Sequence, residues 1–589
     1  MPIRTVCNCL AVVIILLFQQ PLFAQSDSSR IQLNQLGFYP QAPKLAVITG
    51  NNKPASFYMI DAGTKDTVFS GRISTGKQSS NSSTIVQRAD FTALQKSGTF
   101  YISVPGVGQS YPFSISKNVL RPVALSSLKG FYFIRSNMPL EAAFAGPWQR
   151  PAGHPDTVVL IHASAADAHH QTGAVIASPG GWYDAGDYNK YIVNSGITMG
   201  TLMSAYEDFK TYFDTLHTNI PESGDAIPDI LNEVVYNLRW MLTMQDDADG
   251  GVYHKCTNAA FDGMVMPGVT KLPRYVVQKG TAATLDFAAV TAQAARMLQP
   301  FEGALPGLRD SCLKASEQAW KWAVQHPAVS YDQNEINKKF DPDVTTGAYG
   351  DQKFSDEWLW AASELFITTK KKGYYDTVTL RLTDSVGLPA WGDVAMLGYY
   401  SLVRFEKQLP AFTRPDLARI KSRILHLSDR YIASIPTNAF ATVMGHSRND
   451  FIWGSSAVAA NQGIVLINAY LLTKDNRYLK GALSNIDYLL GRNATGYCFV
   501  TGTGSKSPMH PHHRPSVADG VIAPVPGLLS GGPNPGRQDG CKYEFTEPET
   551  AFSDTDCSYA SNEIAINWNA PLVYLAHAVE ALSSGFSKK

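Results

Sequence analysis

Two aspartates in a glycine- and aromatic-rich loop have the spacing of paired catalytic carboxylates. Asp184 and Asp187 stand three residues apart in the segment Gly180-Gly-Trp-Tyr-Asp-Ala-Gly-Asp-Tyr-Asn-Lys-Tyr191. One carboxylate can act as a general base while its neighbour orients a water molecule or shifts the pKa of the base. The aromatic rings of the loop offer flat faces on which sugar rings can stack. The structural alternative is an Asx turn or a surface calcium loop.

A second cluster of acids precedes an apolar stretch near the C-terminus. Asp554 and Glu563 lie just ahead of the run 564–582, whose composition predicts a closing helix. Acids near a helix N-terminus are stabilised by free backbone N–H groups and by the helix dipole. The structural alternative is therefore a helix capped by Ser561 or Asn562 beside solvated acids. A catalytic role requires an opposing carboxylate elsewhere in the chain.

Three histidines and an arginine form a third candidate cluster. The order is Met509-His-Pro-His-His-Arg514, after a run rich in glycine, threonine and serine. This spacing is not that of the usual zinc sites, and no cysteine pair accompanies it. The pattern favours donors of hydrogen bonds to hydroxyl groups and to a carboxylate, with His512 and Arg514 as candidates.

The segments that must position these residues divide into a β region and a helical region. From Arg30 to about Ser116, short apolar runs alternate with turn residues, which is typical of a small β-sandwich. The period then becomes helical, and almost no strand is expected. Long loops are therefore expected to carry the function. The predicted helices lie near 193–210, 227–242, 282–298, 310–325, 356–370, 394–407, 415–434, 456–473, 477–490 and 563–583, and the long loops span 171–192, 245–281, 330–355 and 493–560.

Charge and targeting signals restrict the class of protein. The chain has 50 Lys and Arg against 50 Asp and Glu and no basic run, which argues against nucleic acid as a partner. Residues 1–24 match a signal peptide, with Arg4 ahead of a short apolar core and Ala24 at the expected cleavage point. No later stretch is expected to span a membrane. We therefore expect a secreted or periplasmic protein.

The cysteines are too sparse for a disulfide scaffold. Of the 7 cysteines, Cys7 and Cys9 fall within the predicted signal peptide, so an odd number remains and at least one thiol stays unpaired. Cys541 and Cys557 flank the C-terminal acidic segment. They are candidates for a disulfide in an oxidising compartment.

Together these motifs resemble glycoside hydrolase family 9, a family of cellulase-type enzymes. The Asp-Ala-Gly-Asp-Tyr loop is one hallmark of that family, and Asn34–Pro40 resembles the immunoglobulin-like domain that precedes many of its members. The family's C-terminal signature is matched by Phe552, Asp554, Tyr559, Glu563, Ala565, Asn569 and Ala570. Its histidine signature departs at Cys498 and is otherwise matched by Val500, Thr501, Gly504, Lys506, Pro511, His512 and Arg514.

The resemblance implies a mostly α protein, with an (α/α)6 barrel over 124–585 preceded by an immunoglobulin-like β-sandwich over 30–116. It also implies inverting hydrolysis of β-1,4-glucosidic bonds, with Glu563 as general acid and Asp187 as general base. Asp184 would share the attacking water with Asp187. The residues that would contact sugar or set the environment of the acid are His512, Arg514 and Asp554. The candidates for sugar stacking and a further sugar contact are Trp182, Tyr183, Tyr188, Tyr559 and His254.

No cofactor is expected for the chemistry, and a structural calcium ion is one of two interpretations of a further acidic pair. Asp356 and Glu357 follow a glycine-rich loop, and relatives often bind calcium near such a pair with another aspartate, here Asp393. The other interpretation is a capped helix with acids in its first turn. Some relatives hold zinc with paired Cys and His, but residues 124–170 contain no cysteine, so zinc is not expected.

The leading hypothesis is an endo-acting glucanase that cleaves internal β-1,4 bonds of cellulose or a related β-glucan. The alternative is an exo-acting member, such as a cellobiohydrolase, β-glucosidase or glucosaminidase, since the segment 131–178 could close one end of the site. A non-catalytic carbohydrate-binding protein is disfavoured because both Asp187 and Glu563 are present. The preferred glucan and the oligomeric state stay open at this point.

Overall fold

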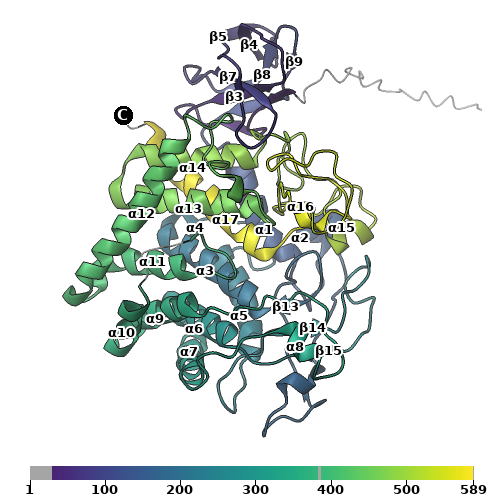
Figure 1. Ribbon diagram of the computed structural model, residues 1–589, viewed down its shortest axis with the longest axis vertical. Helices are drawn as coiled ribbons and strands as arrows, with labels where there is room; N and C mark the ends of the chain where they lie inside the picture. The colour runs from purple at the N-terminus through teal and green to yellow at the C-terminus, as the bar shows by residue number, and fades with distance from the viewer. Residues whose placement is uncertain (1–29, 383–386, 588–589) are drawn as a thin grey trace, which may run out of the picture.

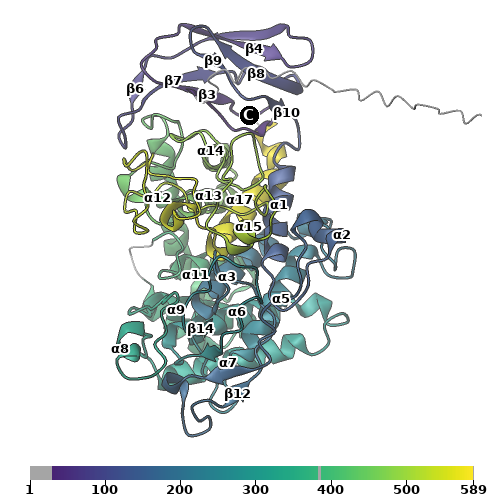
Figure 2. The same cartoon turned by 90° about the vertical axis from the view of Figure 1, so that its right-hand side faces the viewer.

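The computed structural model describes residues 30–382 and 387–587. A small β domain sits on one end of a large helical domain (Figure 1). Turning the molecule by 90° shows the same two layers, with the β domain against the end that carries α14 (Asn476–Leu489) (Figure 2). The predicted signal peptide lies outside the described residues.

The N-terminal domain is a β-sandwich of two sheets. One sheet has the order β1-β3-β7-β6, and the other has the order β2-β10-β8-β4-β5 with β9 paired to β8. Strand β8 shows the alternation expected of a half-buried strand, because Phe100, Ile102 and Val104 point into the core while their neighbours do not. The strands are β1 (Ile31–Gln32), β2 (Gly37–Phe38), β3 (Leu45–Thr49), β4 (Ser56–Asp61), β5 (Thr67–Arg72), β6 (Lys77–Gln78), β7 (Ile85–Asp90), β8 (Gly98–Val104), β9 (Gly108–Gln109) and β10 (Phe113–Ile115).

An inner ring of helices forms the centre of the second domain. Each of these helices is buried along most of its length, and α3 packs against α6 and α17, α6 against α9, α9 against α11, and α13 against α17. Close approach is required in places: a Cβ atom at Gly463 of α13 would lie 2.5 Å from Leu575 of α17. The inner helices are α3 (Ile192–Asp208), α6 (Thr281–Met297), α9 (Ser355–Thr369), α11 (Ala395–Arg404), α13 (Ser455–Thr473) and α17 (Ile566–Ala581).

Outer helices cover this ring with one apolar face each. In α7, buried residues recur at helical spacing from Leu308 to Ala323 while the other face is exposed. The outer helices are α1 (Arg121–Phe133), α5 (Asp229–Thr243), α7 (Leu308–Gln325), α10 (Lys372–Arg381), α12 (Arg414–Ser434) and α14. Helices α1 and α10 were not among those predicted. Short helices lie in the loops, namely α2 (Ala142–Ala145), α4 (Lys210–Phe213), α8 (Gln333–Asn337), α15 (Arg514–Ala518) and α16 (Tyr559–Asn562).

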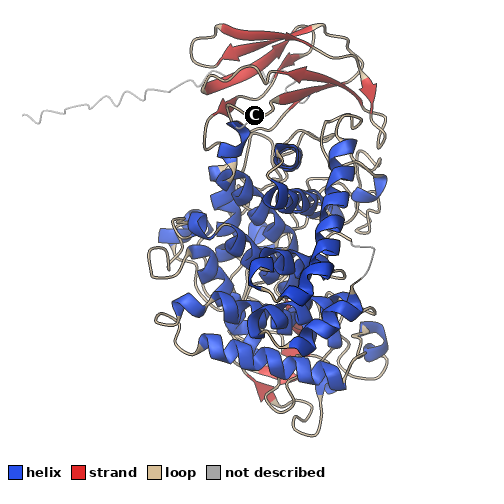
Figure 3. Ribbon diagram, turned by 90° about the vertical axis from the view of Figure 1, so that its left-hand side faces the viewer, coloured by secondary structure: helices blue, strands red, loops and turns tan. Residues whose placement is uncertain are grey.

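A small sheet interrupts the helical domain, contrary to the prediction of almost no strands (Figure 3). Its order is β12-β11-β15-β14-β13, and every residue of β14 is buried. Strands of two to four residues are too short to show an alternating pattern in the sequence. They are β11 (Val159–Ile161), β12 (Val175–Ile176), β13 (Lys190–Tyr191), β14 (Lys255–Asn258) and β15 (Arg274–Val276).

Within residues 30–382 and 387–587, one helix has the length and composition of a membrane span. Helix α13 passes that test, yet 78% of its apolar window is buried inside the protein. Its neighbours are α12, α14 and α17, which cover it within the helical domain. The apolar character of α13 is therefore accounted for by its place in the inner ring.

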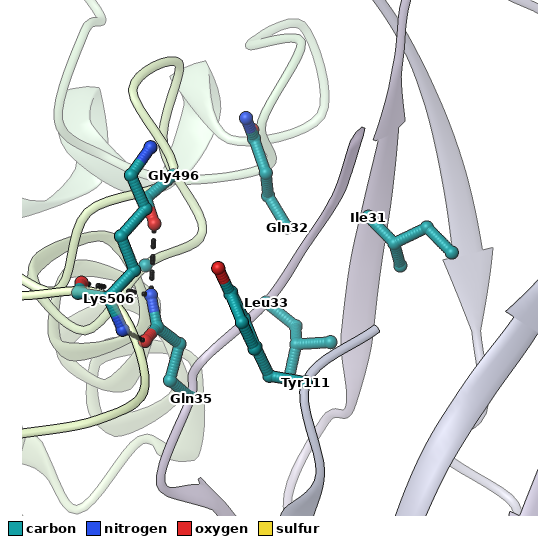
Figure 4. Close-up of a pocket in the computed structure, with 8 residues that line it drawn as sticks. Ile31, Gln32, Leu33, Gln35, Tyr111, Gly496 and Lys506 are labelled. Atoms are coloured by element: carbon teal, nitrogen blue, oxygen red, sulfur yellow. Dashed lines mark hydrogen bonds between the residues drawn. The ribbon is translucent and has the colours of Figure 1, made fainter. Parts of the chain in front are cut away.

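The β domain is joined to the helical domain by polar contacts at its first strands. Gln35 is the centre of one such contact: its Nε2 donates to Gly496 O at 2.9 Å, and its Oε1 accepts from the N–H group of Lys506 at 2.8 Å (Figure 4). The same oxygen accepts from the N–H group of Ser505 at 2.8 Å. Asn34 Nδ2 donates to Asp487 Oδ1 at 2.9 Å. Gln35 therefore supports the start of the loop that leads to the histidine cluster.

A second contact reaches the C-terminal loop. The tip between β6 and β7 supplies Ser82, whose hydroxyl bonds Glu549, and Ser83, whose N–H and hydroxyl bond Glu547 at 2.8 and 2.9 Å. Glu547 and Glu549 precede Phe552 and Asp554 in the chain. The β domain thus contacts both loops that carry the candidate residues of the C-terminal half.

Candidate active site

The aspartate loop leads into β13 and the start of α3. Asp184 is 1% exposed, and its N–H donates to Asn189 O at 3.0 Å, which closes the loop on itself. Its carboxylate accepts from Asn194 Nδ2 and from the hydroxyl of Tyr349, the latter at 2.7 Å. Burial, together with the nearby charge of Asp187, raises the pKa of Asp184 to about 8. Asp184 therefore keeps its proton to a higher pH than an exposed aspartate does.

Asp187 is the acceptor of two side-chain hydrogen bonds. Asn189 Nδ2 and the Tyr191 hydroxyl both donate to its Oδ2, the second at 3.1 Å. The side chain is 5% exposed, so the loop conformation rather than solvent defines its orientation. The other carboxylate oxygen of Asp187, Oδ1, takes part in neither of these bonds.

Glu563 is brought to the same site from the far end of the chain. It lies in an extended link between α16 and α17, and Gly186 N–H donates to its Oε1 at 3.3 Å. Burial first, and the charges of Asp187 and Asp184 next, raise the pKa of Glu563 well above its usual value. Glu563 is therefore protonated in conditions where an exposed glutamate is ionised.

The closing helix begins later than predicted. Helix α17 starts at Ile566 after Ala565, which makes no side-chain capping bond. The predicted caps, Ser561 and Asn562, belong instead to the short helix α16. Glu563 consequently has extended backbone geometry and pairs as a bridge with His512, which aims its side chain across the site rather than along a helix.

The histidine loop and the aspartate loop touch at Gly186. A Cβ atom at Gly186 would lie 2.1 Å from His512 O, so only glycine permits this approach. Arg514 fastens the contact: its Nη1 donates to Gly186 O at 2.7 Å, and its Nε donates to Asp262 O at 2.9 Å. Arg514 is 6% exposed. Its observed role is to hold backbone carbonyls rather than to face the solvent.

His512 stands beside Tyr559 on the Glu563 side of the site. Its Nδ1 bonds Asp556 O at 2.5 Å, and the rings of His512 and Tyr559 are 5.6 Å apart. Burial lowers the pKa of His512, which favours the neutral imidazole. With Nδ1 facing a carbonyl acceptor, the neutral ring carries its proton on Nδ1 and keeps Nε2 as an acceptor.

Asp554 organises the backbone around these residues. Its carboxylate accepts from the N–H groups of Met509 and His510 at 2.9 Å each, and from Asn562 Nδ2 at 3.1 Å. Asn562 directly precedes Glu563. Asp554 therefore links the histidine loop to the chain segment that carries the acid.

Tyr559 has a neighbour that the sequence did not single out. Trp453 is 40% exposed and its ring lies 5.5 Å from that of Tyr559. The two rings and His512 form a row that leads toward Glu563. The available sequence signal for Trp453 was a tryptophan just before a predicted helix, and no motif marked it.

Four predicted sugar contacts are not available to a ligand. Trp182 is 0% exposed and packs against Phe131, with its indole N–H directed at Glu233. Tyr183 and Tyr188 are also buried, and they bond His154 and Val265 O respectively. His254 is buried, its ring stacks on that of Tyr331 at 4.1 Å, and its Nε2 bonds Ala348 O. These rings build the wall of the loop, and aromatic composition alone could not separate that role from sugar binding.

Cys541 and Cys557 are joined by a disulfide, in agreement with their predicted pairing. The other cysteines in the described residues, Cys256, Cys312 and Cys498, are free and buried. Cys557 follows Asp556, whose carbonyl orients His512. The disulfide therefore anchors the segment that holds this histidine.

Replacing both Cys541 and Cys557 with serine is expected to lower the melting temperature by roughly 5 °C or more, because the crosslink restricts the unfolded chain by about 3 kcal/mol. Catalytic activity should fall as well, since the carbonyl partner of His512 becomes mobile. Calorimetry and rate measurements before and after reduction of the native protein would check this. Replacing the buried free Cys498 with serine is the control, and unchanged stability in the double variant would contradict the expectation.

A second cluster of carboxylates lies behind the site. It contains the predicted metal ligands Asp356, Glu357 and Asp393, and burial followed by the charge of Asp356 raises the pKa of Asp393 to about 6. Burial, followed by the charge of Asp356, raises the pKa of Asp286. Burial, followed by the charges of Asp286 and Asp356, raises the pKa of Glu357. Asp351 contributes to each of these shifts.

Two members of this cluster have no basic or amide partner within the described chain. Asp286 and Glu357 are 0% exposed, their four carboxylate oxygens accept no hydrogen bond from a nitrogen donor, and the group that interacts with Glu357 is another acid, Asp356. Buried carboxylates without partners are strongly destabilising unless a proton or a cation compensates them. The donors of this cluster are all oxygen atoms, the type that a hard divalent cation prefers, although the described acids whose ligand atoms lie within 4.8 Å of one another belong to another group. Asp286 and Asp351 were missed in the sequence because neither lies beside the Asp-Glu pair in the first turn of α9.

A third acidic group differs because it already contains a cation. Asp167, His170 and Asp246 lie close together, and Lys279 Nζ is 3.0 Å from Asp167 and 2.5 Å from Asp246. The same ammonium contacts Asp249 at 2.9 Å. Lys279 thus occupies the place that a metal ion would take.

Comparison with known proteins covers most of the chain. Residues 122–576 match Glycosyl hydrolase family 9, and residues 26–109 match the cellulase N-terminal ig-like domain. A xyloglucan-specific endo-beta-1,4-glucanase from Bacteroides ovatus is 45% identical over 94% of this chain and 94% of its own length. Endoglucanase D from Acetivibrio thermocellus is 33% identical over 93% of this chain and 82% of its own length.

Solved structures agree with the sequence comparisons. The structure of a Bacteroides ovatus family 9 glycoside hydrolase superposes with a TM-score of 0.90 at 44% identity, and covers 94% of this chain and 100% of the solved one. Family 9 structures are (α/α)6 barrels, which is the arrangement of inner and outer helices found here. The chain therefore belongs to glycosyl hydrolase family 9, as a glycoside hydrolase with an immunoglobulin-like domain ahead of its (α/α)6 barrel.

Proposed function

We propose that the protein is an inverting endo-β-1,4-glucanase in which Glu563 is the general acid and Asp187 the general base. The observation that carries this proposal is the raised pKa of Glu563, whose carboxyl group opposes the Asp184 and Asp187 pair in one site. Inversion requires a protonated carboxyl on one side of the scissile bond and a carboxylate that holds water on the other. The two loops meet at Gly186, so Glu563 and the aspartate loop border the same site.

In this mechanism the proton moves from Glu563 to the glycosidic oxygen as the bond to the anomeric carbon breaks. Asp187 takes a proton from the water that attacks the opposite face of the sugar. Asp184, held by hydrogen bonds from Asn194 and Tyr349, helps to orient that water. His512 with its free Nε2 accepts a hydrogen bond from a sugar hydroxyl, and Arg514 and Asp554 hold the loops in place.

The proposed substrate is a β-glucan chain, with xyloglucan as the first candidate. This rests on the name of the Bacteroides ovatus relative, which is similar over nearly the whole chain. The half-exposed rings of Trp453 and Tyr559 supply stacking faces for glucosyl units next to Glu563.

Product analysis tests the function. Purified protein incubated with xyloglucan, carboxymethylcellulose and mixed-linkage glucan is expected to produce a rapid fall in viscosity and a mixture of oligosaccharides. Release of glucose or cellobiose alone, without a fall in viscosity, would support the exo-acting alternative. Binding without any product would support a non-catalytic carbohydrate-binding protein.

We also propose that the protein acts in the periplasm or outside the cell. The supporting observations are the signal-like N-terminal sequence and the Cys541–Cys557 disulfide, since such crosslinks persist in oxidising compartments. Fractionation of the producing cells would test this, and recovery of the uncleaved protein in the cytoplasm would contradict it.

A structural calcium ion is proposed at the cluster of Asp286, Asp351, Asp356, Glu357 and Asp393. These acids supply only oxygen donors, and the buried Asp286 and Glu357 lack basic or amide partners among the described residues. The ion would offset their charge next to the loop that carries Tyr349 and play no direct part in the chemistry.

Removal of calcium with a chelator is therefore expected to lower the melting temperature by about 5 °C or more, because a ligand that binds only the folded state stabilises it. Added calcium should restore the value. In Glu357→Gln the response to chelator and calcium should be lost. Asp167→Asn, in the cluster neutralised by Lys279, is the matched control and should keep the response. A native melting curve unaffected by the chelator would contradict the site.

A further inference from the structure

One short loop bonds Asp184 directly and reaches Asp187 through the hydroxyl of Tyr191. The hydroxyl of Tyr349 donates to Asp184 Oδ2 at 2.7 Å. Two residues earlier, Gly347 N–H donates to the Tyr191 hydroxyl at 3.1 Å, and this hydroxyl donates to Asp187 Oδ2 at 3.1 Å. The position of the segment 346–349 therefore determines the hydrogen bonds of both carboxylates.

This segment is held from strand β14. Lys255 Nζ donates to Gly347 O at 2.7 Å and to Thr346 Oγ1 at 3.1 Å. Its neighbours in β14 add a hydrogen bond between the hydroxyl groups of Thr257 and Thr346 at 2.7 Å and one from His254 Nε2 to Ala348 O at 2.7 Å. Lys255 is the member of this group that carries a charge.

The environment of Lys255 is unusual for an ammonium group. Its side chain is 0% exposed, and its remaining donor bonds the neutral Gln333 Oε1 at 2.6 Å. The rings of Tyr191 and Tyr331 lie 5.5 and 5.3 Å from Nζ. Among the described residues no carboxylate forms an ion pair with Lys255, and Asp187 is the acid whose charge reaches it.

Burial without an ion pair lowers the pKa of Lys255 to about 7, which shows how unfavourable the charged form is at this place. An apolar side chain of similar length would pack there without that penalty. Stability of the fold therefore does not explain a lysine at position 255. Its three hydrogen bonds, to Gly347, Thr346 and Gln333, do.

We propose that Lys255 is a positioning residue for the base side of the reaction: it holds the segment 346–349 and, through Tyr349 and Tyr191, orients Asp184 and Asp187. The proposal rests on the function proposed above. Lys255 does not touch the substrate or the reacting atoms. It acts by keeping the two aspartates in the geometry in which one water molecule can be held and deprotonated.

The test compares two substrates that differ in their need for a general acid. Lys255→Met removes the donors and the charge while it keeps the length of the side chain. We expect kcat to fall by about 100-fold, the effect of misplacing a catalytic group by about 1 Å, with KM changed by less than about threefold. The loss should be equal on β-glucan and on 2,4-dinitrophenyl β-cellobioside, because the attacking water needs the base in both cases.

Lys44→Met is the matched control. Lys44 is also fully buried, and its Nζ donates to Pro40 O at 2.7 Å and Ala42 O at 2.9 Å, but it lies in the β domain away from the aspartates. This variant is expected to lose stability while its kcat stays within about twofold of the native value. If Lys255→Met does not fold, Thr346→Val and Tyr349→Phe remove single bonds of the same pathway and should show the same kcat loss without a change in KM.

Each outcome separates the proposal from its alternatives. A native kcat in folded Lys255→Met, a change confined to KM, or a loss on β-glucan that spares the dinitrophenyl substrate would overturn the positioning role. Absence of hydrolysis by the native protein would instead reject the proposed function, whatever Lys255 does.

Discussion

Replacing Glu563 with glutamine is expected to reduce hydrolysis of β-glucan by about 1,000- to 10,000-fold, because general acid catalysis contributes on this order. The substitution keeps the shape of the side chain and removes the proton that the leaving oxygen needs. Gly186 N–H can still donate to the amide oxygen, so the loop contact and the fold should persist. Rates measured on xyloglucan oligosaccharides, with binding measured by calorimetry, check this expectation.

The leaving group provides the control for this variant. A dinitrophenolate departs without protonation, so Glu563→Gln should retain much of the native rate on 2,4-dinitrophenyl β-cellobioside. Equal losses on both substrates would indicate damage to the site as a whole. Normal turnover of β-glucan would remove Glu563 from the role of general acid.

The pH dependence of the native enzyme should reflect the same group. Burial and the charges of Asp187 and Asp184 raise the pKa of Glu563 well above its usual value. The protonated form is the active one, so activity persists above the pKa of an ordinary glutamate and is lost as pH rises through the raised value. On the dinitrophenyl substrate this alkaline loss should be reduced, because the acid is not needed there.

Replacing Asp187 with asparagine is expected to produce a comparable loss, of about 1,000-fold or more, on every substrate. The amide cannot accept a proton from water, and the hydrogen bonds from Asn189 and Tyr191 lose their carboxylate acceptor. The loss should extend to 2,4-dinitrophenyl β-cellobioside, which distinguishes this variant from Glu563→Gln. Steady-state kinetics on the two substrates measure the difference.

A nucleophile that needs no base serves as the control for Asp187. Azide added to Asp187→Ala should restore part of the rate and yield a glycosyl azide of inverted configuration. Asp184→Asn is expected to show a smaller loss, since Asp184 orients water rather than taking its proton. A larger loss in Asp184→Asn than in Asp187→Asn would exchange the two assignments.

Helical periodicity was sufficient to locate the long helices but not every element around the site. The long amphipathic helices α7 and α12 lie within two residues of their predicted limits. Helices α1 and α10 were missed, and the sheet β11–β15 was not expected, because strands of two to four residues have no period to detect. This sheet is important for function, since β14 holds the loop that reaches Asp184 and Asp187.

Aromatic residues illustrate a limit of composition. Trp182 and Tyr183 stand next to the catalytic aspartates in sequence and were assigned to sugar binding, yet both are buried. Trp453, more than 100 positions before Glu563 and outside any recognised motif, is the half-exposed ring of the site. Which face of an aromatic side chain meets solvent depends on the packing of several loops, and no local pattern encodes it.

The sequence by itself determined the family, the order of the domains and the acids on which the proposed chemistry depends, because motifs such as Asp184-Ala-Gly-Asp187 are local and chemically specific. Only the tertiary structure decided which environment each acid has. The pKa of Glu563 is raised because the group is buried and lies near two aspartates from a distant loop. Likewise, only the folded chain places Asp286 near Glu357 and bonds Lys255 to the loop that carries Tyr349. Desolvation and charge proximity act through space, so a linear pattern cannot specify them.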